Sequence, residues 1–173
     1  VRSFHYRYGT DVLVEPQMKA TEFPKVLGID GKRKMSKSLD NHIELAAAPQ
    51  ETEARIKKMV TDPQRKRRSD PGDPGVCNVF SLHKIFTPQE EVNRINVECR
   101  QAGIGCVDCK QIFADNLNLH LQPFREKRAQ LATDPEVVWD ILNDGQKRAR
   151  QIARQTIREV KEAIGLPLPG NTR

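Results

Sequence analysis

The sequence has few aromatic residues and no long hydrophobic run. Aromatic side chains make up 5% of its 173 residues, so a nucleic-acid partner would be held through phosphate contacts more than through base stacking. No apolar segment approaches the length of a membrane-spanning helix. A signal peptide is also absent, and we therefore expect a polar protein of the cytoplasm with no membrane partner.

Several familiar chemical signatures are missing as well. The sequence contains no glycine-rich or Rossmann-type phosphate loop, no catalytic triad and no pair of carboxylates placed for acid–base chemistry. A chain of 173 residues with 37% hydrophobic side chains is nevertheless long enough for one or two domains with a core. Its net charge of +6 favours a polyanionic partner.

One stretch, FPKVLGIDGKRKMSKSLDN at residues 23–41, has the composition of a phosphate-binding loop. Its centre consists of Lys34, Met35, Ser36, Lys37 and Ser38. Lysine is a strong point-charge partner for phosphate, and serine hydroxyls and free backbone amides add donors where a loop forms an anion-binding concavity. Such a run can equally be a solvated turn after a glycine. The residues by themselves leave both interpretations open.

This run resembles the KMSKS signature loop of class I aminoacyl-tRNA synthetases. The surrounding pattern, PxVxGxDGxxKMSKSxxN, is similar to that of the tryptophanyl branch, and the tyrosyl branch is the nearest alternative. The matching positions around the run are Pro24, Val26, Gly28, Asp30, Gly31 and Asn41. The closing segment, LNDGQKRARQIARQTIREVKEAIGL, also resembles the last helix of tryptophanyl enzymes, which tyrosyl enzymes do not share. The resemblance covers nearly the whole chain.

The resemblance implies a ligase that joins tryptophan to its tRNA. Tryptophan and ATP would give tryptophanyl-adenylate and pyrophosphate, and the acyl group would then pass to tRNA(Trp). Lys34 and Lys37 would hold the transferring phosphates while Mg²⁺ shares their charge. Ser36 and Ser38 would assist, and Met35 would lie near adenine.

The family's HIGH signature and amino-acid pocket have no counterpart in the sequence. We therefore expect the chain to correspond to the C-terminal half of such an enzyme, inactive alone and homodimeric when full length. The alternative is a binding module that contributes affinity for tRNA without chemistry.

The expected fold is mainly α-helical. By the resemblance, residues 1–45 are the C-terminal edge of a Rossmann-type α/β catalytic domain, with edge-strand material between residues 10 and 27, and residues 46–173 are an all-helical tRNA-binding domain. Periodicity and cap signals predict helices at residues 1–9, 49–60, 76–86, 88–102, 107–131, 135–142 and 147–164. We expect Thr87 to open a capping box, Pro123 to kink its helix and Trp139 to lie in the core.

Two segments are strongly basic. Residues 65–68 are four consecutive cations in a turn-rich loop, and the closing helix carries a charged face opposite its apolar one. That face consists of Lys147, Arg150, Arg154, Arg158 and Lys161. Either segment could contact RNA phosphates. The first could also be a solvated loop, and the second could pack on the missing catalytic half.

All four cysteines lie within 33 residues and have the spacing C-x21-C-x6-C-x2-C. They are Cys77, Cys99, Cys106 and Cys109. In this setting they indicate a metal site or free thiols rather than disulfides, and both Zn²⁺ and iron–sulfur clusters accept four thiolates. A subset of tryptophanyl-tRNA synthetases has a similar set, with a first gap one residue longer, that holds a 4Fe-4S cluster near the anticodon. The resemblance therefore favours 4Fe-4S over Zn²⁺.

Overall fold

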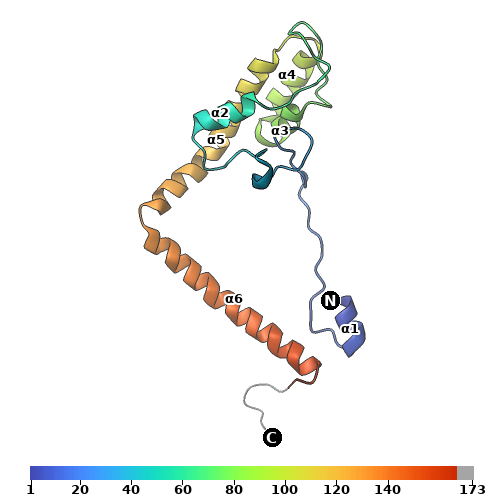
Figure 1. Ribbon diagram of the computed structural model, residues 1–173, viewed down its shortest axis with the longest axis vertical. Coiled ribbons are helices and arrows are strands. Elements are labelled where there is room, and N and C mark those ends of the chain that lie inside the picture. The colour runs from blue at the N-terminus through green and yellow to red at the C-terminus, as the bar shows by residue number, and fades with distance from the viewer. Residues whose placement is uncertain (167–173) are drawn as a thin grey trace. The chain divides into compact units, whose positions relative to one another are not determined.

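The computed structural model describes residues 1–166, which form helices joined by loops (Figure 1). In chain order the elements are α1 (Arg2–Tyr8), the 3-10 helix η1 (Lys37–Leu39), α2 (Pro49–Lys57), α3 (Asn78–Phe86), α4 (Gln89–Arg100), α5 (Cys106–Ala132) and α6 (Pro135–Ala163). The predicted mainly helical fold is confirmed. No strand occurs in the described part of the chain, because a strand at a sheet edge needs a neighbour for its hydrogen bonds. The Rossmann-type edge therefore stays a prediction.

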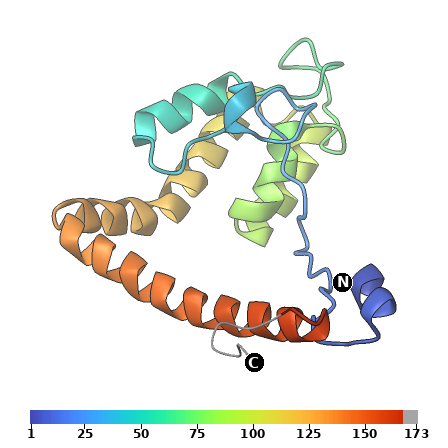
Figure 2. The same ribbon diagram turned by 60° about the horizontal axis from the view of Figure 1, so that its bottom comes forward.

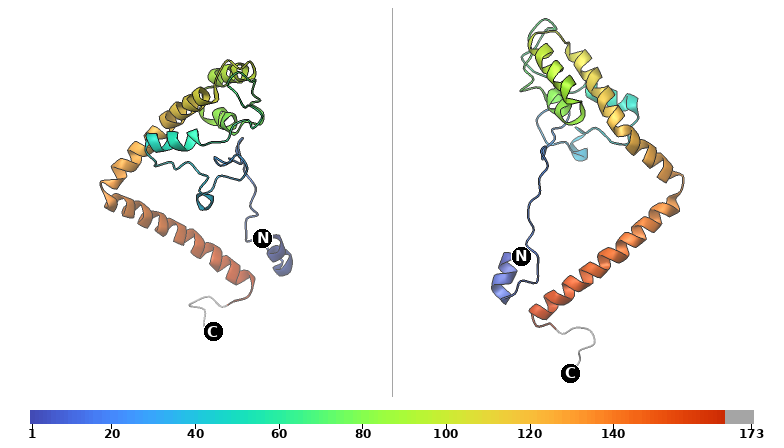
Figure 3. Two further views of the ribbon diagram at one scale, coloured as in Figure 1. Left: turned by 45° about the horizontal axis from the view of Figure 1, so that its top comes forward. Right: turned by 180° about the vertical axis from the view of Figure 1, so that it is seen from behind.

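The chain divides into two compact units. Residues 20–130 form one unit, and residues 1–19 together with those from 131 onward form the other. In the first unit α3 and α4 lie beside α5 in both views of Figure 3. Helix α2 is tied to α5 by Arg125, whose guanidinium donates to Thr52 Oγ1 at 2.9 Å.

Helices α2 to α5 bury most of their apolar positions against one another. The buried apolar side chains are Ile56, Met59, Val79, Phe80, Leu82, Val92, Ile95, Ile104, Phe113, Ala114, Leu117 and Leu121. Val26, Ile29 and Ile43, which flank the KMSKS run, pack partly buried against this core. The helical unit, rather than a sheet, therefore supports the loop in this chain.

Two local predictions in the first unit are wrong. Helix α2 ends at Lys57, and Val60 beyond it is 45% exposed. Thr87 does not open a capping box, because its hydroxyl pairs with His83 Nδ1 at 2.9 Å. Pro123 lies inside α5, which continues on both sides of it, and the kink expected there stays a prediction. A proline leaves the carbonyl four residues earlier without its donor, and that residue, Leu119, is 69% exposed, where water can replace the lost bond.

The closing segments form one helix instead of the two that were predicted. Helix α6 runs through Gly145 without a break (Figure 2). An isolated glycine costs a helix only about 1 kcal/mol relative to alanine, and strong helix formers follow it here. No residue of α6 is buried, and Trp139 is 59% exposed, so the prediction that Trp139 lies in the core is wrong for this chain.

The short N-terminal helix was predicted correctly. Helix α1 ends at Gly9, whose φ of 61° lies in the left-handed region that glycine adopts at helix C-termini. Among residues 1–166, no helix is both long enough and apolar enough to cross a membrane.

Candidate functional site

The KMSKS run begins on the return side of a short hairpin. Gly28 N–H donates to Arg33 O at 2.9 Å, and Met35 N–H donates to Val26 O at the same distance. Leu27 and Lys34 form the antiparallel bridge between these two bonds. The backbone at Lys34 is therefore fixed by its pairing with residues 26–28.

Asp30 organises the tip of this hairpin. Its carboxylate accepts the backbone N–H groups of Lys32 at 3.1 Å and Arg33 at 3.2 Å. These bonds, led by the one from Lys32, lower the pKa of Asp30 to about 2. Asp30 is therefore ionised at neutral pH and can hold the tip closed.

Asn41 closes the base of the loop from the other side. Its Oδ1 accepts Ser36 N–H at 2.8 Å, while its Nδ2 lies 3.2 Å from Asp30 Oδ2 and 3.3 Å from Lys34 O. Its carbonyl accepts Ile29 N–H at 2.8 Å, and the residue is only 3% exposed. The buried amide of Asn41, just after the KMSKS run, thus connects the hairpin tip at Asp30 to Lys34 and Ser36 at the start of the run.

The five predicted loop residues lie together, and their charged heads face solvent. Ser36 and Ser38 place their hydroxyl oxygens 2.9 Å apart. The Lys37 side chain is 81% exposed, with its Nζ 3.9 Å from a carboxylate oxygen of Glu44. Such a long exposed pair contributes little stability and is readily exchanged for another anion. Lys34 is also exposed, and Met35 is half-buried. This arrangement suits reversible phosphate binding.

Gly28→Ala tests the packing at the base of the loop. A Cβ on Gly28 would lie 2.2 Å from Asn41 Nδ2, so Asn41 would have to leave its bonds. We expect the free energy of unfolding, measured by urea denaturation, to fall by about 1–3 kcal/mol. Gly145→Ala is the matched control, because its Cβ meets nothing within 4 Å, and we expect it to be neutral or stabilising. Equal stability of Gly28→Ala and the unmodified chain would contradict the described packing of Asn41.

The four cysteines come from three helices and approach one another at one end of the unit. Cys77 caps the start of α3, Cys99 lies on α4, and Cys106 and Cys109 lie in the first turn of α5. All four are free thiols. Burial, reinforced by the other three thiols, raises the pKa of Cys109 to about 12. Burial also raises the pKa of Cys77 and of Cys99. Their thiolates would therefore need a nearby positive charge.

Arg65 supplies a positive charge at this cluster. Its Nη1 lies 3.8 Å from the sulfurs of both Cys99 and Cys106. Its Nη2 donates to Arg68 O and to Ile104 O, each at 2.8 Å. Its Nε is buried and has no partner in the described part of the chain.

The chemistry of this donor set fits a thiolate-bound metal group, because three of the four thiols are poorly solvated and a guanidinium lies beside Cys99 and Cys106. The geometry is not that of a closed metal site. Among residues 1–166, no group of three or more His, Cys, Asp or Glu side chains is arranged to hold a metal ion.

Sequence reasoning missed Arg65 as a partner of the cysteines, and it also missed His83. His83 is fully buried, and its Nε2 lies 3.2 Å from Cys109 O and 3.5 Å from Cys109 Sγ. The only signal in the sequence was a histidine on the apolar face of a helix four residues before a threonine that could bond to it.

The four basic residues at 65–68 differ in what their side chains contact. Arg65 and Arg68 donate to backbone carbonyls, Arg68 to Gly103 O at 3.3 Å, and so brace the loop before α5. Lys66 and Arg67 are exposed, and no ion pair of theirs is found among the described residues. A pocket of about 490 Å³ lies between this run and the start of α5. Helix α6 presents a second basic groove of about 470 Å³, lined by Lys147, Arg150, Gln151, Arg154, Gln155 and Arg158.

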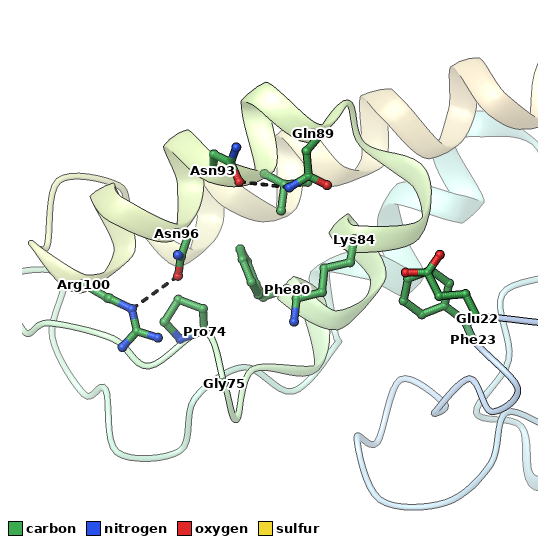
Figure 4. Close-up of a pocket in the computed structure, with 11 residues that line it drawn as sticks. Glu22, Phe23, Pro74, Gly75, Phe80, Lys84, Gln89, Asn93, Asn96 and Arg100 are labelled. Atoms are coloured by element: carbon green, nitrogen blue, oxygen red, sulfur yellow. Dashed lines mark hydrogen bonds between the residues drawn. The ribbon is translucent and has the colours of Figure 1, made fainter.

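A further pocket of about 500 Å³ lies between residues 74–75, α3 and α4 (Figure 4). Most of its polar side chains already have partners. Gln89 donates to Asn93 at 2.9 Å, and Arg100 donates to Asn96 at 3.3 Å (Figure 4). The ammonium group of Lys84 lies 5.4 Å from the centre of the Phe80 ring. We therefore assign no ligand to this pocket.

Comparison with curated proteins finds relatives over almost the whole chain. The tryptophan–tRNA ligase of Aquifex aeolicus is 42% identical over 167 residues, which is 96% of this chain and 42% of that protein. The tryptophan–tRNA ligase of Thermotoga maritima is 42% identical over 166 residues, which is 95% of this chain and 50% of that protein. The chain thus spans about half the length of these relatives.

Solved structures and a family model agree with these relatives. Tryptophanyl-tRNA synthetase from Campylobacter jejuni, complexed with ADP and tryptophan, superposes with a TM-score of 0.74 at 28% identity and covers 95% of this chain and 51% of that one. The family model described as tRNA synthetases class I (W and Y) matches residues 1–122. The resemblance to the tryptophanyl branch is confirmed by these relatives. Because the family model covers well over half of the 173 residues, the chain belongs to the class I tRNA synthetases of the tryptophan and tyrosine family.

Proposed function

We propose that the chain is the C-terminal half of a tryptophan–tRNA ligase, in which it supplies the phosphate-binding loop and a tRNA-binding helical region. The full enzyme would activate tryptophan with ATP and transfer it to tRNA(Trp). The observation that carries this proposal is the KMSKS run, which a buried amide holds at its base while both lysines stay exposed. The relatives, which are tryptophan–tRNA ligases, support the choice of amino acid.

In this reaction the loop acts by position and charge. Lys34 and Lys37 hold the phosphates of ATP as negative charge develops on the departing pyrophosphate, and the Mg²⁺ that accompanies ATP shares that charge. Ser36 and Ser38 donate hydrogen bonds to phosphate oxygens, and Met35 packs near adenine. No covalent protein intermediate is required, because the tryptophan carboxylate attacks the α-phosphate directly.

The proposed domains follow from this assignment. Residues 1–45 complete the catalytic domain, and residues 46–173 form the helical tRNA-binding domain. The full-length enzyme would be a homodimer that works in the cytoplasm, where tRNA is charged. The direct test is to charge tRNA(Trp) with radiolabelled tryptophan using the full-length polypeptide. A folded full-length protein that leaves tRNA(Trp) uncharged would contradict the proposal.

A second function, an inert tRNA-binding module, is favoured by one observation, the groove on α6 that basic side chains line. The mass of the natural polypeptide distinguishes the two functions. A polypeptide of the relatives' length with a HIGH signature upstream supports the ligase, whereas a natural product of this chain alone supports the module.

The structure separates two candidate surfaces for tRNA phosphates. Near the cysteines, Lys66 and Arg67 are exposed cations whose side chains are free for another anion, whereas the side chains of Arg65 and Arg68 donate to backbone carbonyls in the described part of the chain. On α6, Arg150, Arg154 and Arg158 line one groove. We propose that at least one of these surfaces binds tRNA.

Affinity for tRNA should therefore fall steeply as salt rises, because each neutralised phosphate releases counterions. Replacing both Lys66 and Arg67 by glutamine should reduce the slope of log K against log salt by about 2 if that surface is in contact. Replacing Arg150, Arg154 and Arg158 by glutamine tests the other surface in the same filter-binding titration. Arg94→Gln is the matched control, since Glu91 and Glu98 already pair with Arg94. An unchanged slope in both multiple variants would exclude both surfaces.

We also propose that Cys77, Cys99, Cys106 and Cys109 hold a 4Fe-4S cluster, with Zn²⁺ as the alternative. The support is that the four thiols come from three helices and interact electrostatically, with one guanidinium beside Cys99 and Cys106. The bound group would cross-link these helices through thiolate bonds. The sulfurs would have to move from their described positions to bind it, because they form no metal-holding group there.

A further inference from the structure

Asn78 connects the helical core to the turn that precedes the KMSKS run. It is the first residue of α3, follows Cys77 directly and is only 6% exposed. Its Nδ2 donates to Gly28 O at 2.8 Å, across 50 residues of sequence. The Gly28 oxygen also accepts Gly31 N–H at 2.9 Å, which closes the turn. The side chain of Asn78 therefore holds this turn onto α3.

The turn fits closely against this part of the helical unit. A Cβ on Gly31, whose φ is +64°, would lie 3.3 Å from Asn78 Cβ and 3.7 Å from Val60 Cβ. Val60 N–H donates to Ile29 O at 3.0 Å. The position of the turn is thus set by residues that follow α2 and begin α3.

Stability alone does not explain an asparagine at this position. Its Oδ1 is buried and has no hydrogen-bond partner in the described part of the chain. A buried acceptor without a donor is unfavourable, and native structures contain few such groups. The favourable contact that the Asn78 amide makes is the hydrogen bond from its Nδ2 to Gly28 O.

A shift of Gly28 would displace Lys34 and Lys37 through two sets of contacts. Gly28 N–H pairs with Arg33 O, directly before Lys34. Gly28 also packs so closely on Asn41 that no Cβ fits between them, and Asn41 accepts Ser36 N–H. Asn78 therefore holds the carbonyl of Gly28, and Gly28 contacts the loop both before Lys34, through Arg33, and at Ser36, through Asn41.

We propose that Asn78 is a positioning residue for the KMSKS loop. Its amide fixes the turn from Gly28 to Gly31 and thereby sets where Lys34 and Lys37 meet the phosphates of ATP. This inference rests on the proposed function for its catalytic consequence. Its structural part, the hold on the loop, can be tested separately.

The first measurement is hydrogen exchange of the loop amides in the 173-residue chain. In Asn78→Ala, protection of residues 28–41 should fall about tenfold, because a buried hydrogen bond and its carbonyl partner are lost. Phe80→Ala is the matched control, since Phe80 lies on the same helix and is buried, and its core cluster contains no residue of 28–41 in the described part of the chain. It should lower the melting temperature without a selective loss of protection in residues 28–41.

The second measurement is ATP–pyrophosphate exchange by the full-length enzyme. Asn78→Ala should lower kcat/KM for ATP about tenfold and leave the KM for tryptophan unchanged, because the loop meets only ATP. Phe80→Ala should leave both values near those of the unmodified enzyme. If Asn78→Ala fails to fold, Asn78→Ser serves in its place, since serine favours helix starts but cannot reach Gly28.

Normal loop protection and normal ATP kinetics in a folded Asn78 variant would overturn the inference. An equal loss of kcat/KM for ATP in Phe80→Ala would also overturn it, because the effect would then be general destabilisation. Absence of exchange in the unmodified enzyme would instead overturn the proposed function. The hydrogen-exchange result would then decide the inference alone.

Discussion

Lys37→Ala in the full-length enzyme is expected to lower the rate of ATP–pyrophosphate exchange by about 30-fold to 1000-fold. The lysine faces solvent, and its one ion pair in the described part of the chain is a long contact to Glu44, so its removal leaves no buried group unpaired. Its charge acts mainly as negative charge grows on the departing pyrophosphate, and losing such an interaction costs about 2–4 kcal/mol. The loss should therefore appear in kcat, while the KM for tryptophan stays the same.

Lys32→Ala is the matched control for this substitution. Lys32 is an exposed lysine of the same hairpin, and only its backbone N–H contributes to the bonds around Asp30. Its replacement removes one positive charge near the loop but should leave exchange close to normal. A raised KM for tryptophan with unchanged turnover in Lys37→Ala would contradict the assignment of Lys37 to the phosphates.

Cys106→Ser is expected to produce the largest loss of stability. If the four cysteines hold a metal group, its binding energy is part of the folding energy, and one lost ligand should lower the melting temperature by about 10 °C. Anaerobically purified unmodified protein should be brown and contain iron and sulfide, whereas a zinc site would be colourless. The measurements are elemental analysis, the visible spectrum and thermal unfolding.

Val107→Ser controls for the change of residue type at the start of α5. Val107 is 75% exposed and lies between the two cysteines of this turn, so a serine there should alter neither metal content nor melting temperature. Protein with neither iron nor zinc near stoichiometry would show that the cysteines are packed thiols. In that case Cys106→Ser should change stability only slightly.

The lysine–serine run and the Cys106/Cys109 pair could be identified from the sequence because each lies within a few consecutive residues, and their roles in binding stay proposals. The approach of Cys77 and Cys99 depends on how α3, α4 and α5 pack. The alternation of lysine and serine after Gly31 indicated a phosphate loop, and the cysteine spacing put two thiols in one helical turn. The network that holds the loop was not predictable. Asn78 and Gly28 are 50 residues apart, and their contact depends on how α3 packs.

Other predictions from local sequence rules failed because those rules do not include contacts made in the folded chain. The hydroxyl of Thr87 could serve a helix cap or His83, and only the fold shows that it bonds to His83. Periodicity identified the apolar face of the closing helix, but periodicity does not say what covers that face, and Trp139 is exposed in this chain. Helix propensity outweighed the interruption expected before Lys147, so that α6 is one helix.

Amino-acid-dependent ATP–pyrophosphate exchange by the full-length polypeptide tests the central claim most directly. With Mg²⁺ and ATP present, exchange should require tryptophan, should not be supported by tyrosine, and should be absent from the isolated 173-residue chain. Exchange that depends on tyrosine, or none with tryptophan in a folded protein that binds ATP, would contradict the assignment of this loop to tryptophan activation.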